Sequence, residues 1–180
     1  MKFFLLSTFL LLSLCIQAQD QKSPEVSNKV FSVNFLTPGL ELESKLSEKT
    51  TIDLNLTTGF ALTGGSNRDT EFGIFPTFES QYRFYYNLEK RMKKGKNIEN
   101  NSGNYVGAMA SIRSGKPIIG DIEFEDDFAV FLGPVWGLQR YYGSGFKLNL
   151  NLGAGYVFDN ADNSYVSLLV GLRLGWKLGK

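Results

Sequence analysis

The sequence predicts an all-β fold, an eight-stranded antiparallel up-and-down β-barrel, on three observations. Long segments alternate between apolar and polar residues, which is the period of a β-strand with two unlike faces. Glycine is frequent, with 19 residues, and aromatic residues make up 14% of the chain, whereas there are only 5 prolines. No segment carries a long helical period. Together these features favour a closed barrel.

Six segments carry the alternation. In residues 50–62, for example, Ile52, Leu54 and Leu56 share one face, and Thr51, Asp53 and Asn55 share the other. Three segments alternate cleanly, two follow the pattern less strictly, and one is weak. In that order they are residues 50–62, 146–158 and 166–178, then 72–88 and 128–142, then 104–114.

The N-terminal part holds two short candidate strands, residues 30–36 and 40–46. Thr37-Pro38-Gly39 separates them, and Pro followed by Gly predicts the centre of a type II turn. The alternative is one long bulged strand. Single-chain bacterial barrels nearly always have an even number of strands, and only the hairpin brings the count to eight.

The connections fall into two sets, one for each end of the barrel. Residues 47–49, 89–103 and 143–145 belong to one end, and residues 63–71, 115–127 and 160–163 belong to the other. Pro76 and Pro134 lie inside predicted strands. Because proline lacks an N–H group, each predicts a local bulge or a position beyond the hydrogen-bonded belt.

The content of the polar face predicts which face points inward. Glycine recurs there beside charges of both signs, at residues such as Gly107, Gly137 and Gly171. Glycine weakens an exposed strand, whereas in a narrow lumen it makes room for Arg, Lys and Glu. The apolar face of the central strands carries no Asp, Glu or Lys, and its one charge, Arg140, lies near a strand end. We therefore expect the apolar face to contact lipid in a transmembrane barrel.

Aromatic residues at both ends of the apolar face predict two membrane-interface girdles. One girdle comprises Tyr82, Tyr86, Tyr142 and Trp176, and the other comprises Phe60, Phe72, Phe158 and Tyr165. The alternative is a secreted or periplasmic soluble lipocalin-like barrel, in which the aromatic side chains fill an apolar core.

The first residues have the features of a signal peptide. Met1-Lys2 precedes an apolar run too short to span a bilayer as a helix, and Ala18 offers a small residue for cleavage. Cys15, the only cysteine, could mark a lipoprotein, but Leu14 is larger than that cleavage site prefers. We expect a signal peptide over 1–18, a periplasmic segment over 19–28 and an outer-membrane barrel over 29–180.

The sequence indicates no catalytic, cofactor-binding or metal-binding residue. It has no histidine, which removes the usual general base and the histidine-based metal sites. Glu41 and Glu43 share a strand face and invite a paired-carboxylate interpretation, but we expect an ion-pair network that closes the lumen. The other charges expected there are Lys45, Glu79, Arg83, Arg113, Lys147, Arg173 and Lys177.

Two charged connections remain. The acidic loop over 115–127 could bind a divalent cation or a protein, and the basic run over 90–96 could touch anionic lipid or cell wall. We expect both to be solvated. The predicted function is a non-enzymatic outer-membrane protein with a structural or adhesive role, a monomer that contacts lipid, lipopolysaccharide and the barrel assembly machinery. The net charge of +1 indicates no nucleic-acid partner. A narrow pore or transporter is a further alternative.

Three stretches resemble small outer-membrane β-barrel proteins of Bacteroidota, of the OmpA/OmpX-like eight-stranded type. These stretches are Gln17-Ala18-Gln19, the run from Asn34 to Glu43, and Tyr82-Arg83-Phe84-Tyr85-Tyr86. The resemblance spans nearly the whole mature chain and implies an eight-stranded barrel without a particular activity. Such barrels usually end in an aromatic residue, whereas here Trp176 is followed by Lys177-Leu178-Gly179-Lys180.

Overall fold

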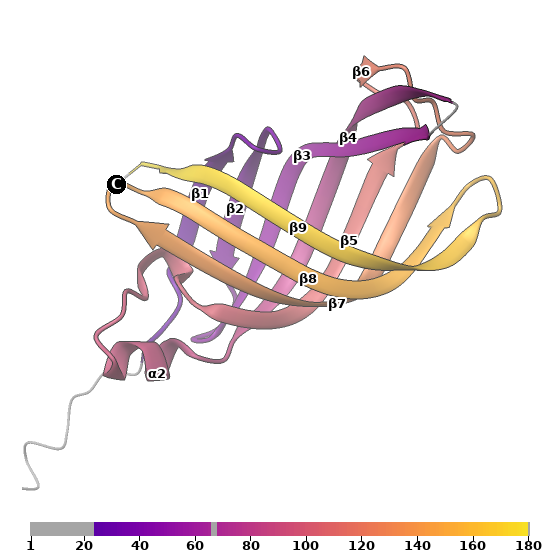
Figure 1. Ribbon diagram of the computed structural model, residues 1–180. Coiled ribbons are helices and arrows are strands. Elements are labelled where there is room, and N and C mark those ends of the chain that lie inside the picture. Colours follow the sequence, from indigo (N-terminus) through magenta and orange to yellow (C-terminus); the bar gives the residue numbers. More distant parts are fainter. Residues whose placement is uncertain (1–23, 66–67, 180) are drawn as a thin grey trace, which may run out of the picture.

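The computed structural model describes residues 24–65 and 68–179, and these form an all-β fold (Figure 1). Eight antiparallel strands pair in chain order, and the first closes on the last to complete a ring, as predicted. The strands of the ring are β1 (Lys29–Asn34), β2 (Gly39–Lys45), β3 (Thr50–Gly65), β4 (Arg68–Tyr85), β5 (Asn104–Ser114), β7 (Phe128–Tyr142), β8 (Phe146–Asp159) and β9 (Ser164–Leu178).

The two ends of the ring differ in their connections. One end, here the α2 end, carries the turns at 46–49 and 143–145, the helix α2 (Leu88–Lys93) and the short helix η1 (Glu99–Asn101). The opposite end, here the β6 end, carries the two-residue strand β6 (Ile119–Gly120), which pairs with β4 (Figure 1). Neither helix was predicted. No helix in the described part of the chain is long and apolar enough to cross a membrane.

The predicted N-terminal hairpin is confirmed, but its turn is not the one expected. β1 and β2 pair over their whole lengths, from Lys29–Ser44 to Asn34–Gly39. The turn occupies residues 35–38, and Gly39 already belongs to β2 without a positive φ. A type II turn centred on Pro38 and Gly39 is therefore wrong. A side chain at residue 39 would lie 2.4 Å from the Leu56 carbonyl oxygen, so this glycine serves close strand approach.

The shortness of this hairpin leaves the wall open towards the β6 end. β2 pairs with β3 only as far as Leu56, and β1 pairs with β9 only from Gly175 onward. Residues 57–65 of β3 and 164–173 of β9 have no strand pairing on this side within the described residues. A pocket of about 270 Å³ lies here and is lined by residues from both faces of the wall, including Phe60, Glu79 and Arg173.

The loop predicted over 63–71 is wrong, and so is the bulge predicted as one alternative at each proline. The other alternative, a position beyond the hydrogen-bonded belt, describes Pro76 with respect to β5. The loop expected over 63–71 is mostly strand, because β3 continues to Gly65 and β4 begins at Arg68. Neither proline causes a bulge, since the one register shift in the described pairings lies between Thr63 and Gly65. Pairing between β4 and β5 begins at Thr77, next to Pro76, and the β7–β8 pairing is interrupted beside Pro134 without a change of register. Beside each proline the strand pairing of the described residues is therefore absent on one side, where the proline has no N–H group to donate.

The two faces of the wall have the orientation expected from the sequence. Leu54, Leu168 and Val170 point outward and are 38%, 82% and 76% exposed, whereas Asn151 and Arg173 point inward and are 2% and 5% exposed. Most of the predicted girdle aromatics are outward and exposed. Tyr165 is the exception: it pairs with Val157, which packs in the lumen, so it lies on the inner face of β9.

The lumen has two unlike halves, of which only the polar one was expected. Towards the α2 end it holds buried polar and charged side chains, and towards the β6 end it holds an apolar cluster of Met109, Phe131 and Val135. The glycines make room for rings more than for charges. A Cβ at Gly137 would lie 2.1 Å from the Tyr105 ring, and one at Gly155 would lie 2.6 Å from Phe131. Aromatic rings therefore fill the space that these glycines leave.

Residues 24–28 cover the α2 end of the lumen. Val26 is buried with Tyr85, Leu88 and Tyr105, and its N–H donates to the Glu48 carbonyl oxygen at 2.9 Å. The Ser27 N–H donates to Asn101 Oδ1 at 2.6 Å. The predicted signal peptide, 1–18, and residues 19–23 of the predicted segment 19–28 lie outside the described residues.

We predict that Gly107→Ala destabilises the barrel. The new Cβ would lie 1.9 Å from the Tyr82 carbonyl oxygen, so β4 and β5 would have to separate, at a cost of roughly 1–3 kcal/mol or more. Gly171→Ala is the matched control, because its Cβ meets nothing closer than Asn151 at 3.6 Å. Urea unfolding followed by circular dichroism measures both. Equal free energies of unfolding for the two variants would contradict the packing described at Gly107.

Candidate functional site

Seven charged side chains meet in the α2 half of the lumen and form what we call the lumenal cluster. The alternation of each strand turns every second side chain inward, and adjacent registers bring these side chains to similar heights. The cluster contains four carboxylates and three cations: Glu41, Glu43, Asp53, Glu79, Arg83, Lys147 and Arg173.

Arg83 lies at the centre of the cluster and is completely buried. Its Nη2 donates to Asp53 Oδ1 at 2.7 Å, and its Nη1 lies 3.5 Å from Glu43 and 3.8 Å from Glu41. The guanidinium also lies 4.7 Å from the centre of the Tyr105 ring. One cation thus contacts side chains from β2, β3 and β5. A planar guanidinium with five donors suits such a position better than an ammonium does.

The other two cations occupy the side of the lumen formed by β8 and β9. The buried Lys147 forms an ion pair with Glu41, and Arg173 forms one with Glu79. Arg173 also approaches Asp53 at 3.5 Å and Glu41 at 3.7 Å. Because each cation is close to a carboxylate, the cost of burying the charges is offset across the group.

Neutral donors complete the coordination of Glu43. Its carboxylate accepts hydrogen bonds from the Thr51 hydroxyl at 2.6 Å, the Tyr85 hydroxyl at 2.7 Å and Gln139 Nε2 at 2.8 Å. All three donors are buried. With both oxygens occupied and no path to solvent, this carboxylate is suited to holding strands in register rather than to acid–base chemistry.

A belt of amides and tyrosines closes the lumen around the cluster. The Tyr105 hydroxyl donates to Asn151 Oδ1 at 2.6 Å, Asn149 Nδ2 donates to Gln139 Oε1 at 3.0 Å, and Gln139 is fully buried. On the other side of the lumen the Ser32 and Tyr141 hydroxyls lie 2.8 Å apart. This network of hydrogen bonds and ion pairs fills the narrow cross-section of the barrel, although Asn34 Oδ1, Asp53 Oδ2 and Lys147 Nζ make no hydrogen bond within the described residues.

Most of the predicted lumenal charges take part. Six of the predicted residues join the cluster, and Asp53 was missing from the predicted set although it alternates with the apolar face of β3. Lys45 instead forms an ion pair with Glu25, and Arg113 pairs with Asp126 at 3.1 Å. Lys177 is half-buried at the α2 end and joins no ion pair among the described residues.

The acidic loop at the β6 end is folded onto the barrel rather than gathered around an ion. Asp126 is buried against Arg113, whose guanidinium stacks 3.8 Å from the centre of the Phe124 ring. Asn160 Nδ2 donates to Asp127 at 3.0 Å. Within residues 24–65 and 68–179 no group of three or more metal-ligating side chains is assembled.

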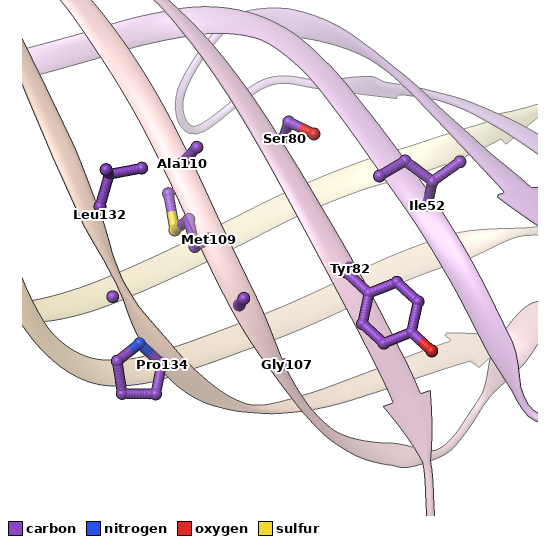
Figure 2. A pocket seen from close by; sticks show the side chains of 10 residues that line it. Ile52, Ser80, Tyr82, Gly107, Met109, Ala110, Leu132 and Pro134 are labelled. Carbon is purple, nitrogen blue, oxygen red and sulfur yellow. The ribbon is translucent and has the colours of Figure 1, made fainter.

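The outer wall carries a groove, and the α2 end carries a basic pocket. The groove, about 590 Å³, lies over β4, β5 and β7 and is lined by small side chains, with Ser80 and Ala110 between Ile52 and Leu132 (Figure 2). The basic pocket, about 420 Å³, is lined by Tyr86, Asn87, Lys90, Arg91, Lys94, Lys96, Asn104 and Arg140. The basic run predicted as a solvated turn therefore contributes to a concave surface.

Comparison with known proteins adds no relative. No family model matches the chain, and neither a curated protein nor a solved structure matches it. The geometry of the lumen and the wall is therefore the basis on which a function can be proposed.

We predict that Arg83→Met lowers the free energy of unfolding by roughly 3–5 kcal/mol, since it leaves Asp53 and Glu43 buried without their central cation. Adding Asp53→Asn to this variant restores part of the loss, because one of the stranded charges is removed. Lys93→Met is the control, because it breaks only the exposed pair with Glu89 and should change little. Urea titration measures all of these variants. A loss at Arg83 no larger than that at Lys93 would show that the cluster does not hold the barrel together.

Proposed function

We propose that this chain is a monomeric barrel of the outer membrane with a side-chain-closed lumen, a non-enzymatic protein whose role is structural or adhesive. The observation that carries the proposal is the inverted distribution of polarity. Leu168 is 82% exposed on the outer wall, while Arg83 and Lys147 are completely buried in the lumen. A barrel folded in water would bury leucine and expose lysine, whereas a barrel in lipid requires the opposite arrangement.

The extent of the exposed apolar surface supports the same conclusion. Every strand of the ring carries large apolar side chains on its outward face, among them Phe31, Leu40, Leu56, Phe78, Val106, Leu132, Leu152 and Val170. Monomeric soluble proteins rarely expose such a continuous apolar belt. Exposed aromatics at both ends of the belt, such as Tyr142 and Phe158, fit the two membrane interfaces.

The gap in strand pairing between β3 and β9 is compatible with a location in the outer membrane. Unpaired backbone groups are tolerated at membrane depth only where they line a cavity or are covered by protein. The pocket between these strands is lined by residues 57–60 of β3 and 169–173 of β9, and also by Glu79 and Asn151, so these parts of the unpaired edges border a cavity with polar side chains. A barrel built to carry an apolar ligand in water would need a largely apolar lumen, and the polar cluster occupies half of this one.

The loop at the β6 end supports a surface-contact role. Its backbone is tied to β4 by hydrogen bonds from the Ile118 N–H to Ile74 O at 2.7 Å and from the Asp121 N–H to Phe72 O at 2.9 Å. Ile118 and Ile119 are exposed there beside acidic residues. An ordered loop with exposed apolar and acidic side chains offers a preformed contact surface.

Membrane fractionation tests the location directly. We expect the protein in the outer-membrane fraction, extractable only with detergent, and we expect unboiled samples to migrate differently from boiled ones on a denaturing gel. The reason is that a closed barrel embedded in detergent resists unfolding. Recovery in the soluble fraction without detergent, together with identical mobility before and after boiling, would refute the proposal.

Val170→Lys tests the lipid contact at one residue. Val170 is 76% exposed near the middle of β9, so a lysine there should cost ~2–4 kcal/mol in a bilayer and almost nothing in water. Ala161→Lys, in the exposed turn at the β6 end, is the matched control. Urea titration of barrels folded into phospholipid vesicles provides the comparison. Equal stability of the two variants in vesicles would place the wall of β9 outside the hydrocarbon.

A further inference from the structure

The basic pocket at the α2 end concentrates positive charge that no described residue neutralises in an ion pair. Its lining includes Lys90, Arg91, Lys94, Lys96 and Arg140 and no carboxylate. None of these five cations forms an ion pair with any residue in the described ranges. The nearest acidic residue of the helix, Glu89, is paired with Lys93 at 2.8 Å, and neither of these two lines the pocket. The pocket is therefore a site for an anion.

The two arginines of the pocket are held in place by backbone and amide oxygens. Arg140 donates to Gly103 O at 2.7 Å and to Asn104 Oδ1 at 2.6 Å, and Arg91 donates to Asn97 O at 2.7 Å. These partners fix the guanidinium groups without cancelling their charge. The three lysine ammonium groups make no hydrogen bond within the described residues, so they are available to an external oxyanion.

The wall directly above the pocket is shaped for a slender apolar group. On the outward face of β4, β5 and β7, the register aligns Tyr82 with Ala108 and Ala108 with Pro134, and it aligns Ser80 with Ala110. The small side chains of Ser80, Ala108 and Ala110 form the floor of the groove between Ile52 and Leu132 (Figure 2). Shallow apolar floors flanked by larger side chains accommodate a chain of methylene groups.

The groove lies over β4, β5 and β7, and the pocket lies where the same strands meet α2, so that one row of side chains separates the two. That row is Phe84, Val106 and Trp136, and the Trp136 Nε1–H donates at 2.9 Å to the hydroxyl of Tyr86, which lines the pocket. From Ala110 to Asn104 the strand spans about 20 Å. With the usual strand tilt this is about 15 Å along the membrane normal, the thickness of one hydrocarbon leaflet.

We infer that this wall binds one anionic phospholipid, with its phosphate in the basic pocket and an acyl chain in the groove. The inference rests on the proposed membrane location and adds a specific lipid site to it. The pocket supplies cations at the height of a headgroup, the Tyr86–Trp136 pair marks the interface, and the groove continues into the apolar belt. A zwitterionic lipid carries its own cation and would gain less from five unpaired cations.

Trp136 is a built-in reporter for this site, because the chain has only two tryptophans and Trp176→Phe leaves Trp136 alone. The Trp176→Phe protein is folded into phosphatidylcholine vesicles that contain a minor fraction of lipid brominated on its acyl chains. Bromine quenches nearby indole fluorescence. We expect brominated phosphatidylglycerol to quench Trp136 well beyond brominated phosphatidylcholine at the same fraction. The triple variant Lys90→Gln, Lys94→Gln, Lys96→Gln should lower the relative affinity for the anionic lipid at least ~10-fold.

The control is a second triple variant that has the same net charge as the first and whose three substitutions also lie at the α2 end. Lys29→Gln, Lys49→Gln and Lys93→Gln remove three lysines that do not line the pocket, and this triple variant should retain the preference. Equal quenching by the two lipids in the Trp176→Phe parent would refute the proposed lipid site. Equal losses of affinity for the anionic lipid in the two triple variants would refute it as well. Displacement of the brominated lipid by inorganic phosphate alone would overturn the lipid assignment, because it would show that the acyl chain contributes nothing. No quenching by either lipid would instead refute the membrane location itself.

Discussion

Arg83 is the residue around which the barrel closes. β2 and β3 deliver carboxylates to its guanidinium, β5 supplies an aromatic ring, and Gln139 of β7 offers Oε1 at 3.3 Å to its Nη1. Strands far apart in the sequence therefore share one completely buried charge. Buried charges persist only when they are paired. A change of register between the strands of the ring would therefore leave a buried carboxylate without a cation. The remaining cations, Lys147 and Arg173, extend the same constraint to β8 and β9.

This polar interior and the apolar wall are two consequences of one strand pattern. Each strand turns alternate side chains inward and outward, so a sequence that alternates polar and apolar residues places the polar set in the lumen and the apolar set on the outer wall. The result is a wall that suits hydrocarbon and a lumen whose α2 half is filled by amides, tyrosines and ion pairs. The proposed lipid site follows from the same wall, where small side chains on three adjacent strands replace large ones.

Several local expectations failed for reasons that involve neighbouring strands. The turn at residues 35–38 ends a short hairpin, and the wall above it stays open because β3 and β9 are much longer than β1 and β2. The basic connection forms α2 because its residues pack under the end of the barrel, where Leu88 is buried beside Tyr85 and Tyr105. The apolar cluster around Phe131 was not predicted, since its members lie on the polar face of their strands and are scattered along the chain.

The sequence by itself determined the fold class, the number of strands in the ring and the face on which most strand side chains lie, because a period of two is a local property that needs no partner strand. It also indicated six members of the lumenal cluster. Only the tertiary structure decided that Arg83 takes Asp53 as its closest carboxylate, that glycines accommodate aromatic rings, and that the groove and basic pocket lie on one wall. Those contacts depend on the stagger between strands and on the closure of the ring, which join residues remote in sequence and leave no periodic signal within any one strand.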